Sequence, residues 1–184
     1  MDSGNNYAEF TVEKKCEGAY KMKRIGMKLL LWMPLFLLGL LGQLITRTPV
    51  IWVILIPVYP LIWLKILKPT FYPYVYIEYE YSIVGGEMRF AEVLGKCKRR
   101  ELFSIKIGDM KAIAPYEEPY KAAADNPEIK KRYELVSTMK AEELYYAIFE
   151  KDEEPCVVFF QPTNKVLSLL RFHNRLTVVK RVNI

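Results

Sequence analysis

The chain concentrates four basic side chains within five positions, at Lys96, Lys98, Arg99 and Arg100. Ammonium and guanidinium groups bind phosphate oxygens through charge-assisted hydrogen bonds. Near an anionic membrane, each such residue contributes about 1 kcal/mol of binding free energy. The segment is therefore a candidate site for anionic lipid headgroups or a protein partner. The alternative is a solvated turn whose charges offset those of Glu92 and Glu101.

Side chains that could perform catalysis are few and scattered. His173 is the only histidine, and the sequence places no acid or nucleophile beside it. The three cysteines are far apart and lack the CxxC or Cys/His spacing of zinc and redox sites, which indicates reduced thiols in a cytosolic compartment. They are Cys16, Cys97 and Cys156. We therefore expect no catalytic residue, no metal site, no cofactor and no enzymatic activity.

Two further patterns have a structural explanation that outweighs a functional one. The acidic pairs and triplets at residues 117–118 and 152–154 are typical of solvated turns. Five tyrosines between residues 72 and 81 could stack on RNA bases, but the region from residue 69 onward carries eighteen Lys/Arg against seventeen Asp/Glu. Such a nearly neutral region does not favour nucleic acid as a partner, so we expect these rings to pack in a sheet or at the membrane interface.

Two uncharged apolar runs, residues 29–45 and 49–64, predict membrane-spanning helices. At about 1.5 Å per residue, 17 to 19 residues span roughly the 30 Å hydrocarbon core. Only Thr46, Arg47 and Thr48 separate the runs, so the expected helices at 29–46 and 49–67 form a hairpin. A signal peptide would have a shorter apolar region and a cleavage site, and a buried soluble helix pair would keep a polar face.

Charge around the hairpin predicts its orientation. Residues 1–68 carry nine Lys/Arg against four Asp/Glu, and the connecting loop contains only Arg47. Basic residues favour the cytoplasmic side, so both termini are expected in the cytoplasm and the chain in the cell membrane. With no ionisable group deep in either run, the hairpin is expected to be an anchor. Its interfacial anchors would be Trp32, Trp52, Trp63, Lys28, Lys65 and Lys68.

The expected organisation has three parts: a basic N-terminal segment (1–27), the hairpin (28–68) and a cytoplasmic β-rich domain (69–184). In the N-terminal segment, residues 7–14 could form a strand, or residues 14–28 could lie along anionic headgroups. The β-rich domain is expected to have about seven strands, starting with an alternating strand at 75–83, a Gly85-Gly86 hairpin turn and a strand at 87–95. An amphipathic helix follows at 163–174, with Asn174 as its left-handed terminator.

These features resemble bacterial PH-like domains attached to transmembrane hairpins, and in particular a family of two-span Firmicutes membrane proteins with no assigned biochemical function. The resemblance is carried by the tyrosine-rich strand and glycine turn (residues 79–86), the basic turn (95–100) and the Ile105 to Ile113 segment with Asp109 and Met110. It implies an α+β fold: a transmembrane helical hairpin, then a PH-like β-barrel or sandwich with a C-terminal helix. The resemblance brings no biochemical function. Because the sequence offers no catalytic constellation, we expect a non-enzymatic module that binds or scaffolds at the cytoplasmic surface of the membrane. The alternative is an accessory subunit of a membrane enzyme or transporter complex.

Overall fold

The computed structural model describes residues 7–179, except the side chains of Leu31, Leu67, Lys68, Tyr72 and Tyr74. The chain forms two compact units. The helical unit comprises Cys16–Ile77 and Leu94–Lys98. The β unit comprises residues 7–15, Glu78–Val93 and residues 99–179 of the described chain.

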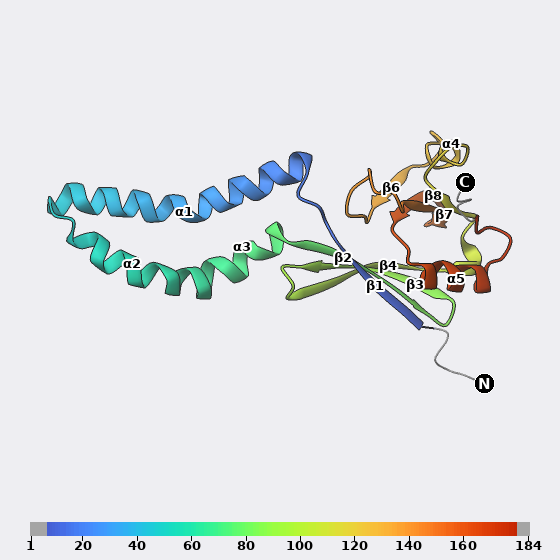
Figure 1. Cartoon of the computed structure of the whole chain (residues 1–184), viewed down its shortest axis with the longest axis horizontal. Coiled ribbons are helices and arrows are strands. Elements are labelled where there is room, and N and C mark those ends of the chain that lie inside the picture. Colours follow the sequence, from blue (N-terminus) through green and yellow to red (C-terminus); the bar gives the residue numbers. More distant parts are fainter. Residues whose placement is uncertain (1–6, 180–184) are drawn as a thin grey trace. The chain divides into compact units, whose positions relative to one another are not determined.

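The helical unit consists of two antiparallel helical arms (Figure 1). Arg47, with φ of 52°, ends the first arm, and the second begins directly after Pro49. The first arm starts well before the predicted residue 29, because the preceding Lys- and Arg-rich stretch is made of good helix formers. The arms are α1 (Gly18–Thr46), and α2 (Val50–Ile62) followed by the π-helical η1 (Trp63–Leu67) and α3 (Lys68–Val75).

Small residues let the two arms approach closely. A Cβ atom added to Gly42 would lie 2.6 Å from Cγ1 of Ile51, and one added to Gly39 would overlap the ring of Trp52. The indole N–H of Trp52 donates to Oε1 of Gln43 over 3.1 Å. Glycine at a helix contact is the packing mode that membrane helices use most, since lipid gives no hydrophobic driving force between them.

Nearly all other side chains of the arms point outward. The segments Gly18–Thr46 and Val50–Phe71 are long and apolar enough to cross a membrane, and only 6% of the apolar window of each is buried. Leu44 and Ile45 are among the exposed apolar side chains. The two predicted apolar helices are thus present, and they could span a bilayer.

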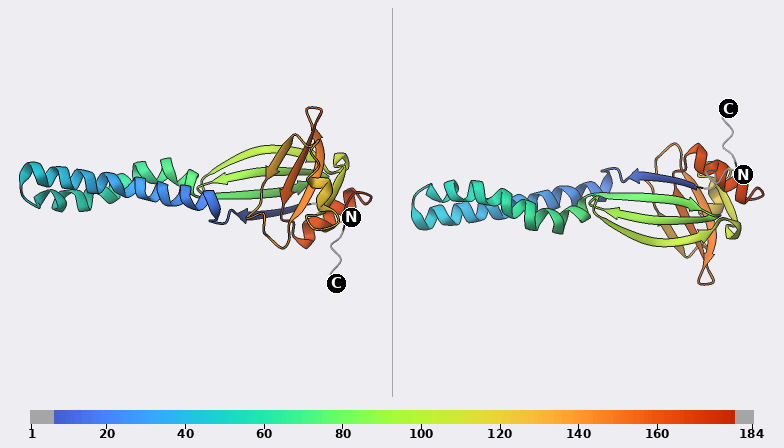
Figure 2. Two further views of the ribbon diagram at one scale, coloured as in Figure 1. Left: turned by 90° about the horizontal axis from the view of Figure 1, so that it is seen from above. Right: turned by 90° about the horizontal axis from the view of Figure 1, so that it is seen from below.

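The β unit contains two four-stranded sheets whose strands cross steeply (Figure 2). Residues 7–13 form a strand antiparallel to β2, which confirms the strand alternative for this segment. The first sheet has the order β1-β2-β3-β4, and the second β5-β7-β8-β6. The strands are β1 (Tyr7–Glu13), β2 (Ile77–Val84), β3 (Glu87–Leu94), β4 (Lys98–Lys106), β5 (Ala112–Pro115), β6 (Lys131–Glu134), β7 (Tyr145–Lys151) and β8 (Glu154–Phe160).

Aromatic rings fill the space between the two sheets. Phe90 of β3 lies 5.0 Å from Phe103 of β4 and 6.2 Å from Phe160 of β8, measured between ring centroids. Tyr81 packs edge-on to both Phe90 and Phe160, and its hydroxyl donates to the carbonyl of Leu135. Tyr79 and Tyr81 are therefore core residues, as sheet packing predicted.

The C-terminal helix α5 (Asn164–His173) packs beside the first sheet, and Thr163 caps the N-terminus of this helix. The short 3₁₀ helix η2 (Ile107–Asp109) joins the sheets, and Asn174 donates its Nδ2 to the carbonyls of Ile107 (3.0 Å) and Met110 (3.2 Å). The predicted left-handed terminator is wrong: Asn174 has φ of −147° and ends the helix through this side-chain anchor instead.

The expected α+β class is confirmed: two long apolar helices precede two sheets and a C-terminal helix. The strands are eight in the described residues, and the sheets do not close into a barrel. A short helix, α4 (Lys121–Ala124), lies in the loop after β5. The sequence of residues 175–184 predicts a last extended segment, but residues 175–177 form a turn, after which Val178 makes a parallel bridge with Ile113. Residues 180–184 lie outside the described chain.

Candidate functional site

The predicted basic turn is shorter than its sequence suggested. Gly95 and Lys96 have positive φ values of 61° and 59° and turn the chain, but β4 already begins at Lys98. The prediction that Lys98, Arg99 and Arg100 lie in a turn is therefore wrong. These residues can form part of the strand because their charged groups lie at the sheet surface while the backbone keeps its hydrogen bonds to the neighbouring strand.

The two arginines of this segment lie on opposite faces of the first sheet, since successive strand residues point in opposite directions. The Arg99 guanidinium donates to the carboxylate of Glu80 in β2. Arg100 donates to Oε2 of Glu92 in β3 over 2.6 Å. The structure thus does not gather the arginines on one surface. Arg100 offsets Glu92 as the solvated-turn alternative predicted, while Lys96 and Lys98 are exposed and belong to the helical unit.

A hollow of about 240 Å³ lies on the face of the first sheet that carries Arg99. Its floor includes the small buried residues Ser82 and Ala91, and longer side chains from all four strands stand around them. Small residues at the centre of a sheet face, with long neighbours, leave such a concavity. The lining residues are Tyr7, Glu9, Ser82, Val84, Arg89, Ala91, Arg99 and Glu101.

The charges around this hollow balance. Arg89 and Arg99 contribute two cations, and Glu9 and Glu101 two anions. The Tyr7 hydroxyl donates to Glu9, and this hydrogen bond raises the pKa of the Tyr7 phenol above its ordinary value. Such a lining suits a ligand that carries charges of both signs better than a phosphate group.

The alternation of residues 75–83 predicts that Glu80 and Ser82 face away from the core. It does not predict that both side chains are buried, because their burial depends on the neighbouring strands.

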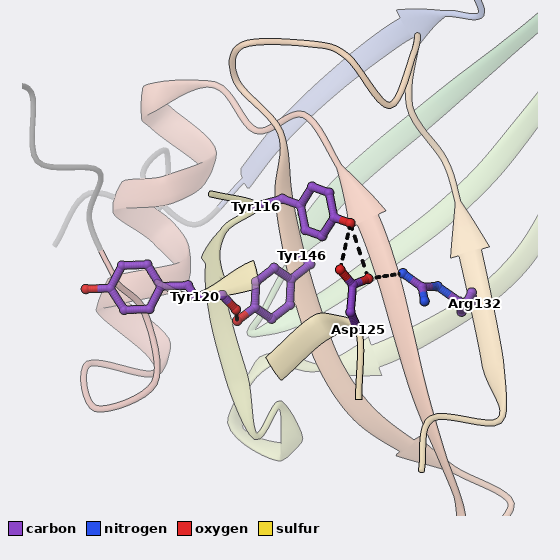
Figure 3. Close-up of polar contacts among 5 residues, drawn as sticks. All are labelled: Tyr116, Tyr120, Asp125, Arg132 and Tyr146. Atoms are coloured by element: carbon purple, nitrogen blue, oxygen red, sulfur yellow. Dashed lines mark hydrogen bonds and ion pairs between the residues drawn. The ribbon is translucent and has the colours of Figure 1, made fainter. Parts of the chain in front are cut away.

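A second polar cluster, on the second sheet, holds a long loop (Figure 3). The Tyr116 hydroxyl donates to both carboxylate oxygens of Asp125, over 3.1 and 3.2 Å, and Arg132 donates to Oδ1 over 2.6 Å. Tyr146 donates to the carbonyl of Tyr120 over 2.8 Å. Hydrogen bonding to Arg132 lowers the pKa of Asp125. A carboxylate with a lowered pKa is a weak base, and both oxygens of Asp125 already accept hydrogen bonds. We therefore interpret the cluster as a clamp that fastens the 116–130 loop.

The remaining predicted site residues are spread over the chain. His173 packs against the turn after β2, its Nδ1 lying 3.2 Å from where a Cβ on Gly86 would be. Cys16 and Cys97 are exposed and Cys156 is buried, where desolvation raises the pKa of its thiol. No group of three or more His, Cys, Asp or Glu in the described residues is arranged to hold a metal ion.

The proposed membrane anchors lie along the helical unit. Trp32 is exposed on α1 with its ring 5.8 Å from Tyr59, Trp52 packs on Gly39, and Trp63 opens η1. Lys28 and Lys65 are exposed, while the side chain of Lys68 lies outside the described part. Their depths in a membrane stay predictions.

We compared the sequence with models of protein families, and the result agrees with this architecture. A family model described as a bacterial PH-like domain (DUF6106) covers residues 4–180. The chain belongs to this family. The match spans both apolar helices as well as the two sheets, so the PH-like family includes the helical unit. No curated protein and no solved structure matches the chain.

Proposed function

We propose that this PH-like protein is a non-enzymatic integral membrane protein whose helical hairpin anchors a binding or scaffold domain at the cytoplasmic surface of the cell membrane. One observation carries the proposal: 6% of each apolar window is buried. Helices that are apolar all round and unburied need lipid as their solvent. The narrower resemblance to two-span Firmicutes proteins belongs to the same proposal.

The interior of the hairpin supports an anchor role over a pore. No Asp, Glu, Lys or Arg occurs between Lys28 and Arg47, or between Arg47 and Lys65. Transport pathways through a bilayer use ionisable or polar groups facing the bundle interior. Here the arms meet instead through Gly39 and Gly42.

Membrane residence can be tested by fractionation of cells that express the full chain. We expect the chain in the membrane pellet after a carbonate wash and in solution only with detergent. A monodisperse, detergent-free chain in the high-speed supernatant would contradict the proposal.

Sidedness can be tested by cysteine labelling in intact cells. Cys156 is unsuitable because it is buried, so the reporter should be Cys97, kept alone in a C16S/C156S variant. The matched control is Thr48→Cys, at an exposed position of the inter-helix turn, in a cysteine-free chain. An impermeant maleimide should label Thr48→Cys at once and Cys97 only after permeabilisation. Labelling of Cys97 in intact cells would reverse the orientation.

Anionic lipid is the expected ligand of the basic segment, and the structure changes which residues should matter. All four basic side chains are exposed, and the charges of Arg99 and Arg100 are each offset by a carboxylate, of Glu80 and of Glu92. Native mass spectrometry of the full chain in mild detergent would count retained phosphatidylglycerol. We expect K96Q/K98Q to retain less than the wild type and R99Q/R100Q to change little. Equal retention by K96Q/K98Q and the wild type would remove the lipid role.

The same purification tests the accessory-subunit alternative. A membrane enzyme or transporter that co-purifies in stoichiometric amount would favour that alternative over an independent scaffold.

A further inference from the structure

The C-terminal helix presents an exposed surface that the hairpin and the basic segment do not use. An open hollow of about 520 Å³ there is lined by Ser168, Arg171, Phe172, Arg175 and Val178. We call these five residues, with the neighbouring Leu176, the α5 surface. Phe172 is 64% exposed and Leu176 99% exposed, whereas Phe90 and Phe160 of the same β unit are fully buried.

The position of these residues on the helix explains their exposure. The buried face of α5 consists of Val166, Leu169 and Leu170. Arg171 and Phe172 lie three and four residues after Ser168, so these three residues share a different face of α5, and Arg175 follows just after the helix ends. Helix α5 therefore has one apolar face that packs in the core. On another face it exposes Phe172, flanked by arginines, to a partner outside the β unit.

The charge of the lining restricts what that can be. Among the described residues that line it, the hollow contains two guanidinium groups and no carboxylate. Guanidinium pairs best with carboxylate or phosphate. The apolar ring of Phe172 between the two arginines favours a ligand that is both anionic and apolar.

The α5 surface is held in place before any ligand arrives. Asn174 is anchored to the carbonyls of Ile107 and Met110, and the amide of Val179 donates to Ile113 over 2.8 Å. A rigid surface loses little conformational entropy on binding.

Within the β unit, the α5 surface and the chain connections to the helical unit lie at opposite ends of the first sheet. His173 packs on Gly86, in the turn after the Val84 end of β2. The four connections leave from the other end, after Lys15 and Val93 and before Glu78 and Arg99. At about 3.3 Å per residue, Glu78 and Val84 lie roughly 20 Å apart along β2. A segment of another protein can reach this end of the β unit, so a peptide is the occupant that we test first, and lipid is an outcome of the same test.

We infer that the α5 surface binds an acidic, amphipathic peptide segment of another protein. Carboxylates of that segment pair with Arg171 and Arg175, and its apolar side chains pack on Phe172 and Leu176. This inference rests on the proposed binding function and names the chemistry of its partner.

The test uses the full chain in mild detergent and a synthetic fluorescent peptide with Glu, Leu and Phe at helical spacing, followed by fluorescence anisotropy. R171E/R175E should weaken binding at least about tenfold, as expected when both charge pairs are reversed. F172S/L176S should also weaken it. The matched control is Lys165→Glu, an exposed charge of the same helix outside the lining, which should leave affinity unchanged.

Several outcomes would overturn the inference. These are equal binding by R171E/R175E and the wild type, equal binding of a peptide with Lys in place of Glu, or no binding at about 1 mM peptide, the weakest affinity worth a specific contact. Stronger competition by short-chain phosphatidylglycerol than by unlabelled peptide would assign the surface to lipid. Binding only after truncation at Val179 would assign it to residues 180–184. The labelling of Cys97 and Thr48→Cys tests the membrane proposal independently, so failure of that proposal can be told apart from failure of this inference.

Discussion

Large apolar side chains are buried in the β unit but exposed in the helical unit. In the β unit, Tyr81, Phe90 and Phe160 are fully buried between two sheets. In the helical unit, Leu44 and Ile45 are exposed although they are equally apolar. Burial of apolar area stabilises a fold in water, so this difference is what the membrane proposal predicts, with water around the β unit and lipid around the hairpin.

The two units also differ in what fixes their geometry. Ring packing across both sheets holds the β unit. The hairpin relies on a few close contacts, chiefly Gly39 and Gly42 with Trp52 and Ile51. At its base, the Tyr20 hydroxyl donates to the carbonyl of Val75 over 2.6 Å, and the Arg24 guanidinium lies 4.3 Å above the Tyr76 ring. We therefore expect the β unit to be destabilised most by substitutions that remove side-chain volume, and the hairpin most by substitutions that add it.

The largest effect is expected from removing a ring of the β core. Phe90→Ala should lower the free energy of unfolding of the β unit by about 3–5 kcal/mol, because the cavity has little room to collapse between two sheets. Cys156 is the only cysteine of the β unit and is buried, so its thiol labelling rate in a C16S/C97S chain reports unfolding of that unit.

The control for this substitution is Phe172→Ala. Phe172 is exposed, so its removal should change the free energy of unfolding by less than about 0.5 kcal/mol. Similar losses for both substitutions would mean that burial does not distinguish the two rings.

The next largest effect is expected from adding volume at the hairpin contact. Gly42→Leu should destabilise the pairing of the arms by about 1–3 kcal/mol, since Ile51 already touches the glycine. Gly26→Leu is the matched control, because nothing lies within 4 Å of a Cβ there. Trp52 fluorescence in a W32F/W63F chain, followed through a titration with SDS, measures the separation of the arms. Equal midpoints for the two variants would disprove close packing at Gly42.

The elements that could be predicted from sequence are those with a strong period. Alternation at residues 75–83 and the Gly85-Gly86 turn predicted β2 and β3, and uninterrupted apolar runs predicted the two arms. The helix at 164–173 was predicted from an apolar face of Val166, Leu167 and Leu170, whereas its buried face consists of Val166, Leu169 and Leu170. Each of these signals is local, so it survives without knowledge of the fold.

The features that could not be predicted depend on how strands and loops are placed in space, which no periodic pattern in the sequence reveals. The basic segment was expected to be one site, but the strand that starts at Lys98 sends Arg99 to Glu80 and Arg100 to Glu92. The clamp on the 116–130 loop joins Tyr116, Asp125 and Arg132, which no spacing rule connects. The hollow on the first sheet exists only because β2 and β3 place the small residues Ser82 and Ala91 at its floor, while longer side chains from all four strands surround them.

A smaller effect is expected from the ion pair at that hollow. The Arg99 side chain is 60% exposed and that of Glu80 only 10%. Arg99→Gln should lower the free energy of unfolding of the β unit by about 1 kcal/mol, since Glu80 loses a charged donor but water reaches the site from the arginine side. Lys98→Gln, the preceding exposed cation, should have no effect in the same Cys156 assay. An effect of Lys98→Gln as large as that of Arg99→Gln would show that general charge, and not the pair, matters.

The smallest effect concerns acid and the loop clamp of Figure 3. Hydrogen bonds from Arg132 and Tyr116 lower the pKa of Asp125 from its ordinary 3.8. A lowered pKa in the folded state stabilises the protein fully above the ordinary value, and this contribution is lost as pH falls through the lowered one. Asp125 is exposed, so the contribution should stay below about 1 kcal/mol.

Asp125→Asn should therefore reduce stability at neutral pH and flatten its decline in acid, relative to the wild type. Urea titrations followed by circular dichroism, with the detergent-held helices as a constant background, measure this difference between about pH 6 and pH 3. Glu128→Gln, an exposed acid of the same loop, should leave the acid dependence as in the wild type. If Asp125→Asn declined as steeply as the wild type, Asp125 would not be the acid that couples the loop to pH, and the clamp would hold through packing of Tyr116 on Phe159, whose ring centroids lie 5.1 Å apart.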